Sequence, residues 1–317
     1  MKKKLLIILA LLLLITGCTK TLKDGKEVIT NPNTGQTLTA NILCQPSKEK
    51  SDEEELSNYE VYEKYNDKLQ VPLEKLPTCS SFTPKKLDYV SLWETLLIKP
   101  LGYILLKLGY LVKSMGISVM IVGLAIRILM MPIQVKSVQQ SENMKKVQPE
   151  LDKIEKKYKN KTDNDSLMMK SQETMMVYKK YKINPVSGCI MAFIQLPLFF
   201  AFLEAINRIP AIFEGTFLTM NLGMTPTTGI SQHNYIYIVL VILIIVTTFL
   251  SFSLSMKNQG SNPEMEKQMK MMSIFMIFMV SIASLSLPTA IALYWIVMNG
   301  FAVIQTFIIK KIMGKRI

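Results

Sequence analysis

Five long apolar runs constrain the fold of this 317-residue chain more than any other feature. Each run is long enough to cross about 30 Å of hydrocarbon as an α-helix, and lipid offers no partner to an unpaired backbone group. The runs cover residues 117–134, 187–206, 235–256, 269–286 and 289–309. The sequence therefore predicts an all-α membrane protein with five transmembrane helices.

Lysine-rich and lysine-poor loops alternate along the chain, and this alternation orients the predicted helices. The loop 135–184 holds twelve lysines, whereas 207–234 holds one arginine, one glutamate and one histidine. The loop 257–268 and the tail 310–317 are basic again. Because cytoplasmic loops are enriched in Lys and Arg, we expect the three basic segments in the cytoplasm and 207–234 outside. The net charge of +13 lies mostly beside apolar runs, which indicates attraction to anionic lipid rather than DNA binding.

The first 17 residues have the pattern of a lipoprotein signal peptide, with a basic start, an apolar run and a small-residue site. The tetrapeptide Ile15-Thr16-Gly17-Cys18 resembles a lipobox, which predicts cleavage before Cys18 and lipidation of that residue. The alternative is an uncleaved anchor helix. In either case the following segment is exported.

Residues 18–89 are polar, with an acidic run at Asp52–Glu55 and scattered prolines. This composition predicts an exported tether with little core. Cys44 and Cys79 lie within it, where a disulfide could persist outside the cytoplasm, although two free thiols fit the sequence as well.

Residues 90–115 form an amphipathic stretch in which Lys99, Lys107 and Lys113 interrupt the apolar surface. A sixth span here would place every basic loop outside. The stretch is therefore predicted to lie as a helix in the outer membrane interface.

The loop 135–184 is predicted to fold as a cytoplasmic helical hairpin. Pro149 opens its first helix, a breaker at 161–165 follows, and a second helix runs beyond. The expected inner face of the first helix carries Leu151, Ile154 and Tyr158, and the second helix carries Met168, Met169, Met175 and Met176. Both a solvated charged hairpin and a docking surface for partners fit this pattern.

Arg127 is a charged residue inside the apolar stretch VGLAIRILMMP, residues 122–132. An ionisable side chain at membrane depth is costly and marks a functional site by default. It lies about seven residues, or roughly 10 Å, from the cytoplasmic helix end, so it could snorkel to the interface. The alternative is a water-filled cavity, and Gln134, seven residues on, would share its helix face. Other polar residues of the spans that support a cavity are Gln195, Asn299 and Gln305.

A methionine row marks the fourth predicted span, with spacings of 4, 3, 4 and 3 that place it on one helix face. Its members are Met265, Met269, Met272, Met276 and Met279. Flexible, polarisable methionines suit contact with varied apolar substrates, and ordinary helix packing is the alternative.

Motifs for catalysis are missing from the sequence. There is no phosphate-binding GxxxxGK[ST] loop, no nucleophile–base pair and no Cys/His cluster, and His233 is the single histidine. We therefore expect no enzyme activity, no cofactor and no metal.

Four motifs occur in the order seen in the membrane protein insertase YidC family, and over residues 88–312 the chain resembles that family. They are RILMMPIQVKS (127–137), KVQPELDKIEKKY (146–158), INPVSGCIMAFIQLPLFFAF (183–202) and LPTAIALYWIVMNGFAVIQ (287–305). The lipobox and five spans are similar to the Gram-positive form. Two departures are Glu204, at a position usually tyrosine-like, and the long exported segment 19–87.

The resemblance implies a helix bundle around a hydrophilic groove that is open to cytoplasm and lipid and closed toward the outside. Arg127 would attract acidic residues in a substrate's exported tail, and Gln195 and Trp295 would line the groove. It also implies nascent membrane proteins as substrates, with the Sec translocon and the ribosome as partners. The protein would reside in a bacterial cell membrane, with its lipid-anchored N-terminus outside and its C-terminus in the cytoplasm.

Two rival functions belong to other classes. A secondary transporter or channel would also need a polar cavity, but the sequence has neither inverted repeats nor intramembrane carboxylates for ion coupling. A structural lipoprotein would use the exported segment as an interaction module.

Overall fold

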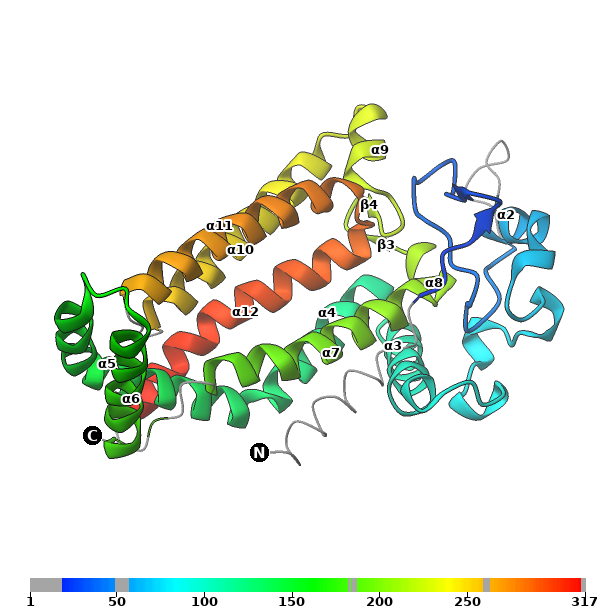
Figure 1. Ribbon diagram of the computed structural model, residues 1–317. Helices are drawn as coiled ribbons and strands as arrows, with labels where there is room; N and C mark the ends of the chain where they lie inside the picture. The colour runs from blue at the N-terminus through cyan, green and yellow to red at the C-terminus, as the bar shows by residue number, and fades with distance from the viewer. Residues whose placement is uncertain (1–18, 49–56, 182, 184–186, 259–262, 315–317) are drawn as a thin grey trace. The chain divides into compact units, whose positions relative to one another are not determined.

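The computed structural model describes residues 19–48, 57–181, 183, 187–258 and 263–314, which are mostly helical (Figure 1). The chain divides into two compact units. Unit 1 contains the chain up to Ala125 together with Pro197–Ile244 and Ser281–Met298. Unit 2 contains Ile126–Leu196, Ile245–Val280 and Asn299–Ile317.

Long apolar helices recur along the described chain from residue 115 onward. They are α4 (Met115–Leu129), α7 (Ser187–Asn207), α10 (Ile236–Asn258), α11 (Pro263–Ser286) and α12 (Thr289–Gly314). By length and composition, Ile236–Ser255 and Thr289–Ile312 can each cross a membrane, and a bent pair that begins with α4 would add a third span. Shorter apolar stretches in α7 and α11 occupy the other two predicted spans. The predicted helical, multi-span architecture is confirmed, and the number five stays a prediction.

The first predicted span, 117–134, is not one straight helix. Helix α4 ends at Leu129 and α5 (Met131–Tyr158) begins two residues later, with a bend of 51° between them. Pro132 accounts for the break, because it has no N–H to donate and its ring clashes with the carbonyl four residues earlier. A proline is well tolerated in the first turn of a new helix. The continuous helix predicted for this span is therefore wrong.

The hairpin of unit 2 pairs α5 with α6 (Asn164–Lys180). The prediction that Pro149 opens a helix is wrong, because α5 runs through it. Val147 and Leu151, on either side of that proline, are buried with Ile183 in a small core. This packing stabilises the helix where the proline removes one backbone hydrogen bond. The predicted breaker is confirmed, since Asp163 caps α6 by accepting a hydrogen bond from the Ser166 backbone N–H at 2.9 Å.

Two charged pairs join the helices of the hairpin and show that they run antiparallel. Lys180 Nζ lies 3.1 Å from the Glu150 carboxylate near one end, and Lys157 pairs with Glu173 nearer the other. The hydroxyls of Tyr181 and Tyr158 donate to the same two carboxylates. Hydrogen bonds from Tyr181 and Lys180 lower the pKa of Glu150, and those from Lys157 and Tyr158 lower the pKa of Glu173.

The segment predicted as a polar tether is instead folded, and we call its described part, residues 19–48 and 57–89, the N-terminal module. Its elements are β1 (Lys23–Asp24), β2 (Glu27–Val28), α2 (Asn58–Lys64) and short helical turns at Asn66–Lys68, Leu73–Lys75, Cys79–Ser81 and Pro84–Lys86. Its core contains Leu22, Leu38, Ile42, Val61, Tyr62, Leu69, Leu73 and Leu76. These apolar residues are widely spaced and follow no helix or strand period, so composition alone predicted disorder.

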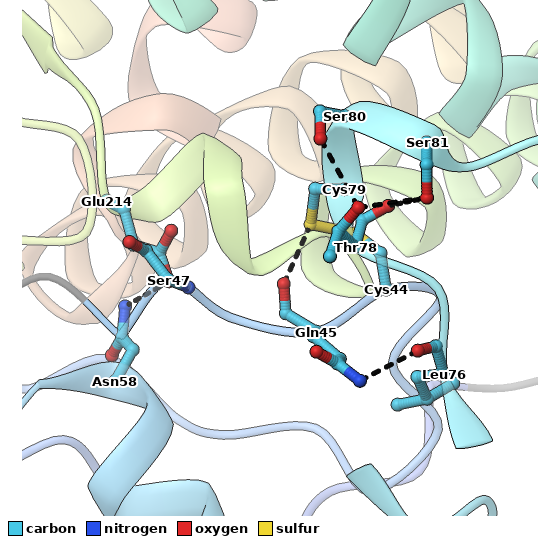
Figure 2. Close-up of a disulfide and its surroundings, with 10 residues drawn as sticks. All are labelled: Cys44, Gln45, Ser47, Asn58, Leu76, Thr78, Cys79, Ser80, Ser81 and Glu214. Carbon is cyan, nitrogen blue, oxygen red and sulfur yellow. Dashed lines mark hydrogen bonds between the residues drawn. A yellow bond between two sulfur atoms is a disulfide. The ribbon is translucent and has the colours of Figure 1, made fainter. Parts of the chain in front are cut away.

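A disulfide and a helix cap stabilise this small module. Cys44 and Cys79 are joined by an S–S bond of 2.04 Å, which settles the choice between disulfide and free thiols (Figure 2). Ser57 and Glu60 form a reciprocal capping box at the start of α2. Small domains with limited cores commonly depend on such covalent links.

Hydrogen bonds attach the N-terminal module to the segment 207–234 within unit 1. This segment contains α8 (Pro210–Phe213), β3 (Thr216–Phe217), β4 (Met220–Asn221) and α9 (Pro226–Ser231). The contacts run from Leu43 N to Arg208 O at 2.8 Å, from Thr225 N to Thr34 O at 2.9 Å, and from Ser47 N to the Glu214 carboxylate at 2.9 Å. The module is thus anchored to the body of unit 1 at several points.

The stretch predicted as an amphipathic helix, 90–115, forms a π-helical turn (Glu94–Ile98) followed by α3 (Lys99–Leu111). Lys107 and Lys113 are exposed as expected, but Lys99 is only 1% exposed, so its predicted surface position is wrong. Its Nζ donates to the Leu87 and Asp88 carbonyls at 3.2 and 2.6 Å. Lysine is almost never fully buried unless it is paired in this way.

Candidate functional site

Arg127 lies two residues before the end of α4, in unit 2, and its side chain is half-buried. The guanidinium Nη1 donates a hydrogen bond of 3.3 Å to the side-chain oxygen of Gln195, which is 68 residues away on α7. The two residues that the sequence singled out on separate spans are therefore in contact. Because the Gln195 amide is neutral, this bond orients the guanidinium without cancelling its charge.

Pro197 adds polarity to the α7 side of this pair. It lies inside α7, two residues after Gln195, and cannot donate the hydrogen bond that the carbonyl of residue 193 would otherwise receive. Side-chain amides and unsatisfied carbonyls at membrane depth are tolerated where they face protein or a wet cavity. Within unit 2, the structure therefore places a cation beside a neutral amide.

The remaining polar candidates of unit 2 lie on α5 and α12. Gln134 is half-buried on α5, and the bend at Met130 means that it shares no continuous helix face with Arg127, contrary to expectation. Asn299 is half-buried. Gln305 is only 2% exposed, and its Nε2 donates to no partner among the described residues. The structure thus pairs Arg127 with Gln195. That Gln134, Asn299 and Gln305 belong to the same site stays a proposal.

Trp295 belongs to unit 1, where it packs among aromatic side chains. Its ring meets Phe199 edge-on, with centroids 5.3 Å apart. Its neighbour Tyr294 stacks on Phe202 at 4.3 Å. Gly123 of α4 belongs to the same cluster, because a Cβ there would lie 3.0 Å from the Tyr294 ring. In the described contacts Trp295 is part of this aromatic packing between α7 and α12.

Three members of the methionine row are exposed on α11. The exposed fractions are 60% for Met272, 40% for Met276 and 48% for Met279. The side chains of Met265 and Met269 lie outside the described residues, as does Cys18. The three described methionines are therefore partly exposed, and ordinary packing against a neighbouring helix stays a prediction, as does substrate contact.

A buried ionic cluster in unit 1 escaped the sequence analysis. Arg208 is 3% exposed and lies 2.9 Å from the Glu94 carboxylate and 3.2 Å from that of Glu204. Lys99 pairs with Glu94 at 3.4 Å, and Trp93 donates its indole N–H to Glu204 at 2.9 Å. Glu204 is 6% exposed and therefore lies inside the protein. The spacing of Glu204 and Arg208 by four residues was the one local signal that could have paired them.

Metal chemistry has no candidate site among the described residues, where no group of three or more His, Cys, Asp or Glu side chains could hold an ion.

Comparison with known proteins places this architecture in a family. A family described as 60Kd inner membrane protein matches residues 107–316, which include Arg127 and Gln195. The membrane protein insertase YidC of Oceanobacillus iheyensis is 35% identical over 185 residues, which cover 57% of this chain and 69% of that protein. The chain belongs to the YidC family.

Other YidC relatives come from related bacteria. The membrane protein insertase YidC 2 of Listeria innocua is 33% identical over 57% of this chain and 59% of its own length. MisCA of Bacillus subtilis, also a membrane protein insertase, is 33% identical over 57% of this chain and 64% of its own. The chain thus spans less than two thirds of these two relatives. Membership of the YidC family makes the protein a multi-span helical insertase of the cell membrane and not an enzyme. The family match begins at residue 107, after the N-terminal module.

Proposed function

We propose that this protein inserts nascent membrane proteins into the bilayer through a hydrophilic groove in which Arg127 attracts acidic residues of the substrate's exported tail. The observation that carries the proposal is the Arg127–Gln195 hydrogen bond, which holds a cation between two apolar helices. An arginine at the centre of a spanning helix costs about 2.5–3.5 kcal/mol in insertion scales. Arg127 lies in the last turn of α4, where the cost is smaller, but a charge among apolar residues still calls for a compensating role.

Long-range attraction and hydrophobic transfer would drive the reaction together. The guanidinium and water in the groove would lower the barrier for a polar tail, and the substrate's own apolar helix would then partition into lipid. The membrane potential would assist acidic tails, by about 2.3 kcal/mol per charge per 100 mV. Gln134, Asn299 and Gln305, which also belong to unit 2, complete the proposed groove.

The exposed apolar surface of unit 2 supports lipid contact during this transfer. Met272, Met276 and Phe278 of α11 and Val246 and Phe249 of α10 are each at least 40% exposed. Large apolar side chains that are exposed in number favour a membrane or partner contact. We propose that the methionine row meets the substrate helix as it leaves the groove.

The topology of the proposal keeps five spans, 117–134, 187–206, 235–256, 269–286 and 289–309. The lipidated Cys18 and the N-terminal module would lie outside, α3 would lie in the outer interface, and the α5–α6 hairpin and the tail would lie in the cytoplasm. Support comes from the alternation of lysine-rich loops. The hairpin would receive nascent chains from the ribosome or alongside the Sec translocon.

Insertion into proteoliposomes tests the role of Arg127. A single-span substrate with an acidic exported tail is added to vesicles holding wild type, Arg127→Ala or Arg127→Lys, and protease protection of the tail is scored over time. Because a hydrogen bond to a charged group is worth about 1.5–3 kcal/mol, we expect Arg127→Ala to slow insertion at least about tenfold. Arg127→Lys should retain most activity.

A substrate whose tail carboxylates are replaced by amides is the matched control, and it should lose far less in the Arg127→Ala vesicles. Equal rates for all three proteins with the acidic substrate would show that Arg127 only anchors its helix. No protection with any of them would reject an autonomous insertase and make an obligatory partner or a transporter the next reading.

A further inference from the structure

A cavity of about 610 Å³ lies in unit 1 between α3 and the turns that follow the disulfide. It belongs neither to the Arg127 site nor to the buried ionic cluster. Its lining residues are Cys79, Ser80, Ser81, Phe82, Thr83, Tyr103, Leu106, Lys107, Tyr110 and Leu111.

The polar part of the lining favours an anionic, oxygen-rich group. Five of the lining residues carry hydroxyls, and they are Ser80, Ser81, Thr83, Tyr103 and Tyr110. The Ser81 hydroxyl donates to the Thr78 carbonyl at 3.2 Å, so the donors for a ligand are found among the other four. Lys107 is the single charged residue of the lining, and its side chain is exposed. A lysine ammonium in a cavity whose lining also carries hydroxyl groups is a suitable environment for a phosphate oxygen.

The apolar part of the lining continues from the cavity onto the surface of α3. Phe82 and Leu106 are buried at its base, whereas Leu111 is 76% exposed at its edge. Ile104, on the same helix, is 48% exposed. A ligand that satisfies both parts has a charged head for the hydroxyls and a hydrocarbon portion for Leu111.

Covalent and close contacts hold the cavity open before any ligand arrives. The disulfide fixes Cys79, and Ser80 and Ser81 continue the same turn, where the Thr78 hydroxyl donates to the Ser81 Oγ at 2.9 Å (Figure 2). On the opposite wall, Gly102 lets α3 approach the module, because a Cβ there would lie 3.0 Å from Leu43. A preformed site loses little entropy on binding.

We propose that this cavity binds the headgroup of an anionic phospholipid, with the phosphate at Lys107 and the hydroxyls and the acyl chains passing Leu111. The lipid would tie the N-terminal module and α3 to the membrane surface. The inference does not involve Arg127, although it uses the proposed position of α3 in the interface.

Native mass spectrometry of the full chain in a neutral detergent tests the site. Equimolar dihexanoyl-phosphatidylglycerol and dihexanoyl-phosphatidylcholine compete for wild type, Lys107→Gln and Lys85→Gln. Lys85 is exposed and lies two residues after Thr83 but outside the lining, so it controls for general surface charge. We expect one retained phosphatidylglycerol per chain and about tenfold weaker retention in Lys107→Gln alone.

Three results would overturn the proposal. One is equal retention of the two lipids by wild type. The second is unchanged phosphatidylglycerol retention in Lys107→Gln, or the same loss in Lys85→Gln. The third is displacement of the lipid by inorganic phosphate at equal concentration, which would show that the acyl portion contributes nothing. Tyr103→Phe, which removes one hydroxyl and keeps the ring, should weaken retention with an unchanged melting temperature. These readouts are separate from insertion activity.

Discussion

Substitution of Arg208 by methionine should be among the most destabilising single changes in unit 1. The guanidinium lies 2.9 Å from Glu94 and 3.2 Å from Glu204, and all three side chains are at most 7% exposed. Methionine has similar length but no charge. Lys99 would remain near Glu94 at 3.4 Å, whereas Glu204 would keep the indole of Trp93 as its described donor.

The expected cost follows from what the substitution leaves behind. Removing one partner of a buried ion pair typically destabilises a protein by about 3–5 kcal/mol, because the remaining charge is buried without compensation. The backbone bond from Leu43 N to Arg208 O is unaffected, so the variant isolates the side chain. We therefore expect Arg208→Met to lower the free energy of unfolding by about 3–5 kcal/mol.

Glu204→Gln is the matched control. Its amide oxygen can still accept from Trp93, and Arg208 keeps its pair with Glu94. The expected loss is smaller, about 1–2 kcal/mol. Denaturant titration of the full chain in micelles, followed by tryptophan fluorescence, measures both variants, and Trp93 is one of only two tryptophans in the chain. A loss below about 1 kcal/mol for Arg208→Met, or an equal loss for the two variants, would refute the reasoning.

Three further changes test other parts of the structure. The double variant Cys44→Ser, Cys79→Ser opens a loop of 35 residues and should lower the free energy of unfolding by about 3–4 kcal/mol. The measurement is the melting temperature, which reductant should lower in wild type but not in the variant. Pro149→Ala restores a hydrogen-bond donor inside a continuous helix, so it should stabilise the middle of α5 by about 1–3 kcal/mol and slow backbone hydrogen exchange there. Unchanged exchange would mean that a helix begins at that proline. Acid should loosen the hairpin, because the lowered pKa values of Glu150 and Glu173 stabilise the fold above the ordinary glutamate value of 4.5, and that contribution is lost as pH falls through the folded pKa values. Protection factors of α5 and α6 between pH 7 and pH 3, which correct for the pH dependence of intrinsic exchange, measure this effect. Glu150→Gln with Glu173→Gln should reduce the pH dependence and leave the part due to Asp163, whose pKa is also lowered by its bonds to Ser166.

Local sequence predicted helices well where a single physical cause dominates. Apolar runs, the lysine alternation and the Asp163 cap each act within a few residues, so the helical, multi-span class and the hairpin followed from them. Arg127 and Gln195 were also recognisable, because a charge and an amide in apolar runs are conspicuous. Prediction failed at Pro149 and Pro132, where the outcome depends on what packs against the helix beside each proline.

Local sequence was enough to recognise a helical membrane protein, its apolar runs and the polar side chains within those runs. These properties follow from burial of apolar runs and from backbone hydrogen bonds that are satisfied within each helix. Only the tertiary structure decided that residues 19–48 and 57–89 fold, that Cys44 and Cys79 are joined, and that Arg208 lies between two carboxylates. Those outcomes depend on contacts between residues as many as 199 positions apart, such as Gln232 and Asn33, and no local pattern specifies which distant groups will meet.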